Sequence, residues 1–181
     1  DREIAYSKRF IEDTTGKDIA HFCYPYGYYN ADIIARVKRA GYRSAVTVNP
    51  CANGRDSSLL ALGRYIIAPW TGVDDLAEKL AARPLDVSVT PPDGAVQSDA
   101  TRTVTCRLSA PDELERVRMK WEWKWADCDW TLGASDVTWS SAAPLAAGTY
   151  PAQIHAWDRA SNHYSYCWLF QQVDGTAGTR H

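Results

Sequence analysis

The sequence predicts an α/β part over residues 1–84, followed by an all-β sandwich over residues 85–174. In the first seventy residues, stretches with helical spacing alternate with short apolar runs, which is typical of parallel α/β architecture. Beyond residue 84, apolar and polar residues alternate with period two in short segments separated by turn residues, which favours an antiparallel sandwich. Residues 175–181 are expected to form a disordered tail.

Two helices are predicted near the start of the chain. The first spans residues 3–15, and Gly16 is expected to close it as a left-handed cap. The second spans residues 31–40, and Asn30 is a good N-cap for it. The second helix gathers three apolar residues on one face: Ile33, Ile34 and Val37.

Three strands are expected in the same part, at residues 19–24, 43–48 and 63–67. The first is a short apolar run of the kind that suits a buried strand. A third helix is predicted over residues 74–82. After Pro84 the residue pattern changes from helical spacing to period-two alternation, so the boundary between the two parts is placed there.

Period-two alternation marks the predicted strands of the sandwich. They are Val87–Val89, Thr103–Leu108, Met119–Trp125, Val137–Trp139, Tyr150–Trp157 and Tyr164–Phe170. Because Trp121, Trp123 and Trp125 alternate, they are expected to share one face of their strand. An inward face would make them core, whereas an outward face would make them a stacking platform for glycan. The core is favoured, since three adjacent exposed Trp side chains would form a large apolar patch.

The composition indicates a folded protein. Apolar residues make up 45% of the chain and charged residues 23%. The net charge of -2 suggests neither a nucleic-acid partner nor an anionic membrane, and no run is long and apolar enough to span a bilayer. There are eight Trp and ten Tyr against three Phe, which fits either sugar-stacking faces or two Trp-rich cores. The chain starts without Met, so it is processed, cut or a partial reading frame.

Five cysteines occur without any CxxC pair, so a zinc knuckle is not expected. In an oxidising compartment, Cys106 and Cys167 could form a disulfide between an early and a late strand of the sandwich. The alternative is that all five are buried thiols.

Three segments of the first part carry a family resemblance. Residues 22–30, FCYPYGYYN, are similar to the segment F-A-Y-P-[FY]-G-x-Y of the polysaccharide deacetylase family, also called the NodB-homology or carbohydrate esterase family 4 domain. Residues 40–48 and 62–66 resemble its A-G-[YF]-x-x-A-[VF]-T segment and its closing strand. The resemblance covers about residues 1–70. It implies that residues 1–84 are the C-terminal part of a deformed, NodB-like (β/α) barrel with a linker helix.

The second part resembles bacterial immunoglobulin-like or fibronectin-like modules. Residues 137–162 follow the pattern V-T-W…P-L-x-x-G-T-Y…A-x-D-x-A-G-N, with Ser161 where Gly is usual. This implies an immunoglobulin-like fold for residues 85–174. Since such modules are common on secreted carbohydrate-active proteins, an extracellular or cell-surface location is expected.

The deacetylase resemblance implies which residues form a site. The backbone N–H of Tyr26 would donate to the tetrahedral oxyanion, and Pro25 and Gly27 would hold the turn that exposes it. Tyr24 and Tyr28 would line a sugar subsite together with this turn. Without the resemblance, an ordinary strand-to-helix turn would explain the same residues.

Arg64 and His21 are weaker candidates. The resemblance implies that Arg64 orients an active-site carboxylate, although a lone Arg at a strand end is more often a solvated charge. His21 precedes the turn on the strand predicted to be buried, so a core histidine is favoured over a catalytic one.

The family hydrolyses acetyl groups with a divalent metal, zinc or similar, held by an Asp and two His. The four His of this chain match no such motif, so no metal site is expected in it: His21, His155, His163 and His181. The sequence therefore predicts a fragment of a secreted, metal-dependent polysaccharide deacetylase, a hydrolase of non-peptide carbon–nitrogen bonds, that is inactive alone. The alternative is a catalytically inactive protein that binds glycan or serves a structural role at the cell surface.

Overall fold

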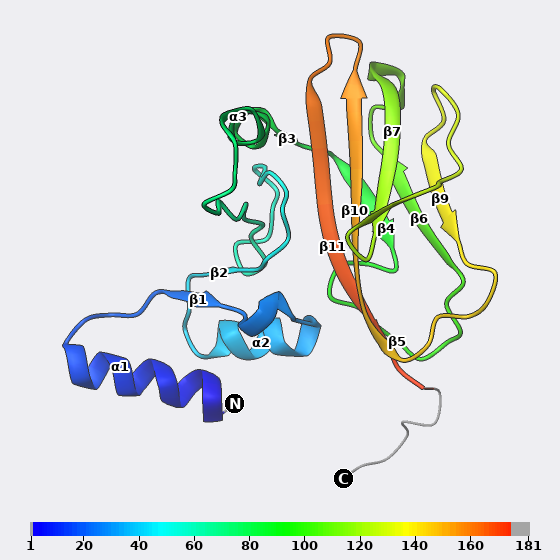
Figure 1. Ribbon diagram of the computed structural model, residues 1–181. Helices are drawn as coiled ribbons and strands as arrows, with labels where there is room; N and C mark the ends of the chain where they lie inside the picture. Colours follow the sequence, from blue (N-terminus) through cyan, green and yellow to red (C-terminus); the bar gives the residue numbers. More distant parts are fainter. Residues whose placement is uncertain (1, 175–181) are drawn as a thin grey trace.

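The computed structural model describes residues 2–174, in which an α/β part stands beside a pair of β-sheets (Figure 1). The predicted tail at residues 175–181 lies outside the described residues. Among residues 2–174, every helix is too short or too polar to cross a bilayer.

The α/β part contains short helices and one small parallel sheet, in which β1 pairs with β2. Its elements are η1 (Arg2–Tyr6), α1 (Ser7–Thr15), β1 (His21–Cys23), η2 (Pro25–Gly27), α2 (Ala31–Arg39), β2 (Ser44–Val46) and α3 (Val73–Ala81). The predicted part of a (β/α) barrel is not seen, because this part of residues 2–174 has a single two-stranded parallel sheet. The predicted strand at residues 63–67 is also absent. There the Arg64 N–H donates to Asn49 O at 2.8 Å, which ties this segment to the loop after β2.

The helix ends follow local chemistry. Gly16 closes α1 with φ of 66°, as predicted. Asn30 caps α2, because its side chain accepts a hydrogen bond from Ile33 N at 2.9 Å. Val37 of α2 is fully buried against the α/β core. These features depend on neighbours in the sequence, so they could be predicted from it.

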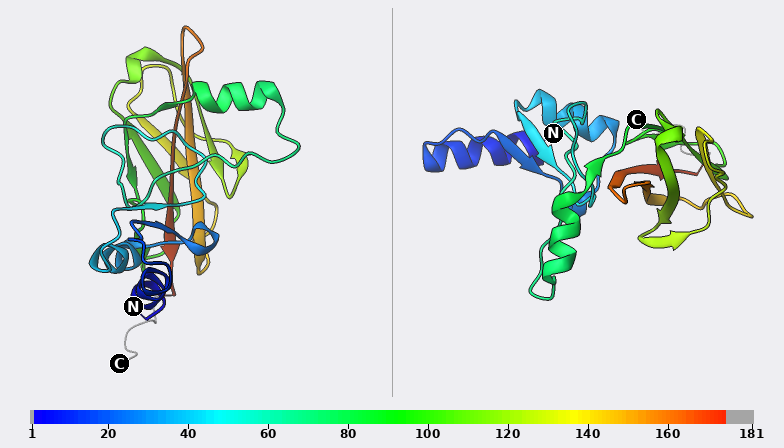
Figure 2. Two further views of the ribbon diagram at one scale, coloured as in Figure 1. Left: turned by 90° about the vertical axis from the view of Figure 1, so that its left-hand side faces the viewer. Right: turned by 90° about the horizontal axis from the view of Figure 1, so that it is seen from above.

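Several apolar surfaces of the α/β part are exposed. Tyr6, the N-cap of α1, is 61% exposed and Phe10 of α1 is 58% exposed, and the helix projects away from the sheets (Figure 2). His21 and Cys23 at the two ends of β1 are also exposed, so the prediction of a buried strand is wrong. In the described residues β1 pairs with β2 alone, which leaves its other edge without a strand partner.

The second part has two antiparallel layers. β10 (Gly148–Asp158) pairs with β11 (His163–Gln172) and with β7 (Leu114–Trp121), and β8 (Lys124–Ala126) adds to the edge beyond β7. The short strands β3 (Arg83–Pro84) and β5 (Val96–Gln97) pair with β11 in parallel. The smaller sheet has the order β4-β6-β9, formed by β4 (Val87–Thr90), β6 (Thr103–Leu108) and β9 (Asp136–Ser140). Through β3, the last two residues before the predicted boundary at Pro84 add a short strand to the edge of the large sheet.

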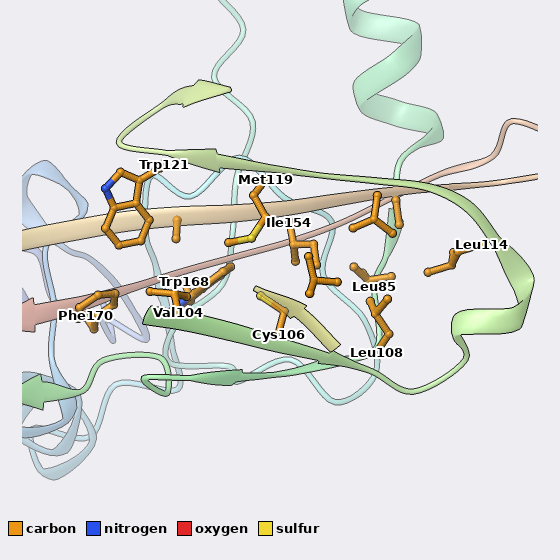
Figure 3. Packing of buried hydrophobic residues seen from close by; sticks show 14 residues of the cluster. Leu85, Val104, Cys106, Leu108, Leu114, Met119, Trp121, Ile154, Trp168 and Phe170 are labelled. Carbon is orange, nitrogen blue, oxygen red and sulfur yellow. The ribbon is translucent and has the colours of Figure 1, made fainter. Parts of the chain in front are cut away.

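The two sheets share one apolar core (Figure 3). Val104, Cys106 and Leu108 point into it from β6, as the alternation in that strand predicted. Trp168 and Phe170 meet them from β11. Trp121 stacks on Trp139 of the opposite sheet, with ring centroids 4.0 Å apart.

The residues at 119–125 form a hairpin, not one strand. Glu122 and Trp123 have φ of 47° and 69°, the signature of a two-residue type I′ turn between β7 and β8. The turn reverses the chain, so Trp121 lies in the core whereas Trp125 pairs with Lys120 on the outer face. The prediction that the three Trp residues share one face is therefore wrong. The turn lacks the Asn-Gly or Asp-Gly signal that would have identified it.

The proposed Cys106–Cys167 disulfide is also wrong. Cys106 faces the core between the sheets, whereas Cys167 alternates with the core residues Trp168 and Phe170 and so faces the α/β part. All five cysteines are free thiols.

Buried polar contacts join the two parts. Tyr29 is completely buried, and its hydroxyl donates to Asp93 Oδ1 at 2.6 Å. The same carboxylate accepts from Leu169 N at 3.1 Å, and Leu169 packs in the core of the α/β part. Burial raises the pKa of Asp93, and the donors on its carboxylate oppose that rise. Asp93 thus receives hydrogen bonds from both parts.

Replacing Tyr29 by Phe should lower the free energy of unfolding by about 2 kcal/mol, because a buried carboxylate loses a donor. Urea denaturation would measure the change. Tyr150→Phe is the matched control, since that hydroxyl donates at 2.9 Å to Ala146 O in an exposed contact. Equal losses in the two variants would contradict the role given to the Tyr29–Asp93 bond.

Candidate functional site

The candidate site is built on the tight turn η2 that follows β1. Tyr26 and Gly27 both have left-handed backbones, with φ of 56° and 77°. The turn is closed by Gly27 N donating to Tyr24 O at 2.9 Å and by Tyr28 N donating to Pro25 O at 3.2 Å. Neither of these bonds uses the Tyr26 N–H, and the Tyr26 side chain is 86% exposed.

Gly27 is required by close packing as well as by its backbone angle. A Cβ at this position would lie 2.2 Å from Val48 Cγ2 and 2.9 Å from Val48 N. Val48 follows β2, so the turn rests directly on the backbone of the neighbouring segment. The sequence predicted that Gly27 helps to form the turn, whereas its contact with Val48 is a feature of the tertiary structure.

Tyr24 supports the turn from inside the α/β part. It is 1% exposed, and its hydroxyl donates to Leu60 O at 2.7 Å. Burial, together with the Asp93 charge, raises the pKa of Tyr24 to about 12. The ring packs at 5.3 Å from that of Tyr29, so Tyr24 connects the turn to the contact between the two parts.

Two hollows flank the turn. One has a volume of about 310 Å³ and is lined by Tyr26, Gly27, Tyr28, Val48, Asn49, Trp123, Pro151 and Leu169. The other has a volume of about 780 Å³, and Tyr24, Pro25 and Tyr28 are among its lining residues. Tyr28 is 55% exposed and contributes to both. The structure therefore brings all five predicted residues, 24–28, to the walls of these hollows.

Trp123 is the site residue whose place could not be predicted. It lies in the β7–β8 turn of the sandwich, is 50% exposed, and lines the smaller hollow with Tyr26. Its position beside Tyr26 depends on the β7–β8 hairpin, and the sequence contains no turn motif that would have predicted this hairpin.

Arg64 and His21 stand apart from this arrangement. Arg64 is exposed, and no carboxylate among residues 2–174 forms an ion pair with it. His21 is exposed and lies 2.9 Å from Ser44 Oγ through Nδ1, so the prediction of a core histidine is wrong.

The described residues do not fit a metal site. Within residues 2–174, no three side chains of the ligating types His, Cys, Asp and Glu are grouped to hold an ion. His155 and His163 lie in the sandwich and contact each other, far in sequence from the turn.

These two histidines form a buried polar cluster with Gln153. His155 Nε2 lies 3.0 Å from Gln153 Oε1, which requires this nitrogen to donate. His155 Nδ1 then accepts from His163 Nε2 at 2.9 Å. Burial lowers the pKa of His155 to about 3, and the positive charge of Lys120 adds to this effect. The cluster is therefore neutral at pH 7.

Comparison with known proteins finds the deacetylase family in the same segment. Residues 1–45 match the family model described as Polysaccharide deacetylase, a range that contains the turn and excludes Arg64. A curated Bacillus subtilis (strain 168) protein named "Putative polysaccharide deacetylase YxkH" is 31% identical over 67 residues. That match covers 37% of this chain and only 24% of the relative.

Solved structures resemble the chain only weakly. CopC from Methylosinus trichosporium OB3b has a TM-score of 0.42 at 12% identity, covering 54% of this chain and 98% of CopC. The fibronectin(III)-like modules of Clostridium thermocellum CbhA have a TM-score of 0.37 at 14% identity, covering 67% of this chain and 55% of theirs. Both TM-scores are low, so neither likeness assigns a fold or a ligand to this chain.

Gly27→Ala should be strongly destabilising, by about 3 kcal/mol, because it combines left-handed strain with a clash against Val48. Gly16→Ala is the control, since it has φ of 66° and no atom within 4 Å of the added Cβ. It should cost about 1 kcal/mol. Thermal and urea denaturation would compare them, and a Gly27→Ala loss no larger than that of Gly16→Ala would contradict the packing role.

The His155 cluster predicts a pH dependence of stability. The folded-state pKa lies below the ordinary value of 6.5, so the contribution is fully present above pH 6.5 and is lost as the pH falls towards 3. Between pH 7 and pH 5 the loss should be about 2 kcal/mol.

The measurement is the free energy of unfolding at the two pH values in wild type and in His155→Gln. The variant should lose about 2 kcal/mol less than wild type on acidification. An unchanged pH dependence in His155→Gln would refute the assignment.

Proposed function

We propose that this chain is part of a secreted polysaccharide deacetylase that hydrolyses N- or O-acetyl groups on a glycan. One observation carries the proposal: the family match at residues 1–45 includes the left-handed turn that presents the Tyr26 N–H beside two hollows. The activity of the whole protein belongs to the proposal, because the chain spans about a quarter of the curated relative.

The turn would act on the charge that develops during hydrolysis. Water adds to the acetyl carbonyl carbon, and the carbonyl oxygen becomes a tetrahedral oxyanion. The Tyr26 N–H would donate to this oxyanion, a contribution of about 2.7–4 kcal/mol in acyl transfer. The C–N or C–O bond then breaks, the leaving nitrogen or oxygen takes a proton, and acetate is released.

Aromatic rings around the turn would hold the sugar. Tyr26 and Tyr28 are exposed at one wall of the smaller hollow, and Trp123 is half-exposed at another. Such side chains combine an apolar face with a hydrogen-bonding group, which suits the C–H faces and hydroxyls of a sugar ring. The sandwich would thereby contribute directly to the substrate subsite.

The rest of the catalytic centre would lie in a segment outside these residues. The family resemblance implies a divalent metal with Asp and His ligands, and residues 2–174 do not fit such a site. The exposed apolar side chains of Tyr6, at the end of η1, and of Phe10, in α1, support packing of this part against additional structure. Arg64 would meet its carboxylate partner there.

The sandwich would be an immunoglobulin-like accessory module. Counting β4, β6, β7, β8, β9, β10 and β11 as strands one to seven, the sheets have the orders 1-2-5 and 7-6-3-4. This crossed-over arrangement of early and late strands supports the immunoglobulin-like assignment. An extracellular location is proposed with it.

The 181-residue chain alone should release no acetate from acetylated chito-oligosaccharides or acetylated xylan, with or without zinc or cobalt. The parent protein with its flanking segments should release acetate in a metal-dependent manner. Metal-dependent release by the chain alone would show that the proposed division of the site is wrong. No release by the parent on any acetylated glycan would favour the inactive glycan-binding alternative.

A variant links the activity to the turn. In the parent protein, Gly27→Ala should lower kcat by about 10²–10³, the effect of losing one oxyanion donor, with a smaller change in KM. Gly16→Ala should leave kcat unchanged, because the added Cβ meets no atom within 4 Å. Equal kcat in both variants would argue against an oxyanion role for Tyr26.

A further inference from the structure

The outer face of the large sheet carries a row of cations. Arg116, Arg118 and Lys120 alternate along β7, so all three point away from the sandwich core. Trp125 of β8 and Trp157 of β10 lie opposite them in register. We call these five residues the cationic–aromatic surface.

Each cation of this surface lies over an indole ring. Arg116 Cζ is 3.9 Å from the ring centroid of Trp157. Arg118 Cζ and Lys120 Nζ are 4.2 Å and 4.5 Å from that of Trp125. Cation–π contacts at these distances hold the long side chains in place without neutralising them. In the described part of the chain, none of the three cations forms an ion pair.

The surface continues into a groove beside α3. The groove has a volume of about 190 Å³, and its walls include Lys120, Gln153, His163, Tyr65, Asp75 and Glu78. Lys79 also lines the groove and pairs with Asp75, so two carboxylates and two cations balance there, and the carboxylates of Asp75 and Glu78 accept hydrogen bonds. The row of cations therefore ends in a groove of balanced charge, not in a further excess of positive charge.

We propose that the cationic–aromatic surface binds an acidic polysaccharide, one whose sugars carry carboxylates, as uronic acids do. The guanidinium groups of Arg116 and Arg118 match carboxylates in fork geometry. The indole rings suit the apolar faces of sugars, and the groove beside α3 accepts hydrogen bonds from neutral hydroxyls.

The charge pattern favours this ligand over a nucleic acid. A nucleic acid carries a phosphate on every residue, and the groove at the end of the row offers no net positive charge to continue the contact with a polyanion. A glycan with spaced carboxylates can place its carboxylates against the cations and its neutral hydroxyls in the groove. The net charge of the whole chain, -2, also disfavours general polyanion binding.

None of the five residues of this surface lines the two hollows at the Tyr26 turn, so binding does not require deacetylase activity. Affinity gel electrophoresis of the 181-residue chain in polygalacturonate is the test. Carboxyl-reduced polygalacturonate, which has the same backbone without the charge, is the neutral comparison. The chain should be retarded by the first and not by the second, and raising the salt from about 50 mM to about 200 mM should weaken the retardation.

Variants assign the binding to named residues. Arg118→Gln and Trp125→Ala should each weaken binding about three- to tenfold, and the triple variant Arg116→Gln, Arg118→Gln, Lys120→Gln should abolish retardation. Arg102→Gln removes the same charge from an exposed position next to the smaller sheet and should bind as wild type does. Near-UV circular dichroism would check that each variant is folded, and Trp125→Phe replaces Trp125→Ala if the latter is not.

Three outcomes would overturn the proposal: no retardation by polygalacturonate, equal retardation by its carboxyl-reduced form, or wild-type binding by the triple variant. Tighter binding to single-stranded oligo-dT, lost in the same variants, would assign the surface to nucleic acid instead. Acetate release by the parent protein is measured separately, so failure of the proposed function would leave this test intact.

Discussion

The buried hydrogen bond between Tyr29 and Asp93 joins the two parts of the molecule close to the candidate site. Tyr29 sits directly after the Tyr26 turn, and Asp93 also receives the backbone N–H of Leu169 from β11. Because an unpaired carboxylate in this position would be costly, the bond constrains where the turn lies against the sandwich. Through it, a turn in one part and Trp123 in the other come to line the same hollow.

The β-sandwich contributes two different faces to function. Its inner face is an ordinary apolar core, in which Trp121, Trp139 and Phe170 pack together. Its outer face pairs cations with indole rings and ends near polar groups that accept hydrogen bonds. Period-two alternation along β7 separates the two faces, so a single strand supplies both core residues and the cationic row. The proposed deacetylase turn and the proposed acidic-glycan surface therefore lie on one scaffold.

The exposed apolar groups of α1 and the free edge of β1 distinguish the α/β part from the sandwich. In the sandwich, strands β6, β7, β10 and β11 bury their apolar faces against each other. In the α/β part, Tyr6 and Phe10 remain exposed, and a hollow of about 780 Å³ lies between η1, α2 and the turn. This contrast is the physical basis for proposing that the remainder of a catalytic domain packs against residues 1–84.

The sequence by itself determined the features that depend on near neighbours. The Gly16 cap, the Asn30 cap, the alternation of Val104, Cys106 and Leu108, and the Pro25–Gly27 turn were all predictable, because local backbone preferences and periodicity decide them. Only the tertiary structure decided which groups meet across long distances in the chain. The Glu122–Trp123 turn carries no hairpin signal, yet the chain reverses there, with Trp121 in the core and Trp125 on the opposite face. The missing barrel, the exposed His21 and the orientation of Cys167 have the same cause: burial depends on which segments pack together, and periodicity specifies a face without naming its partner.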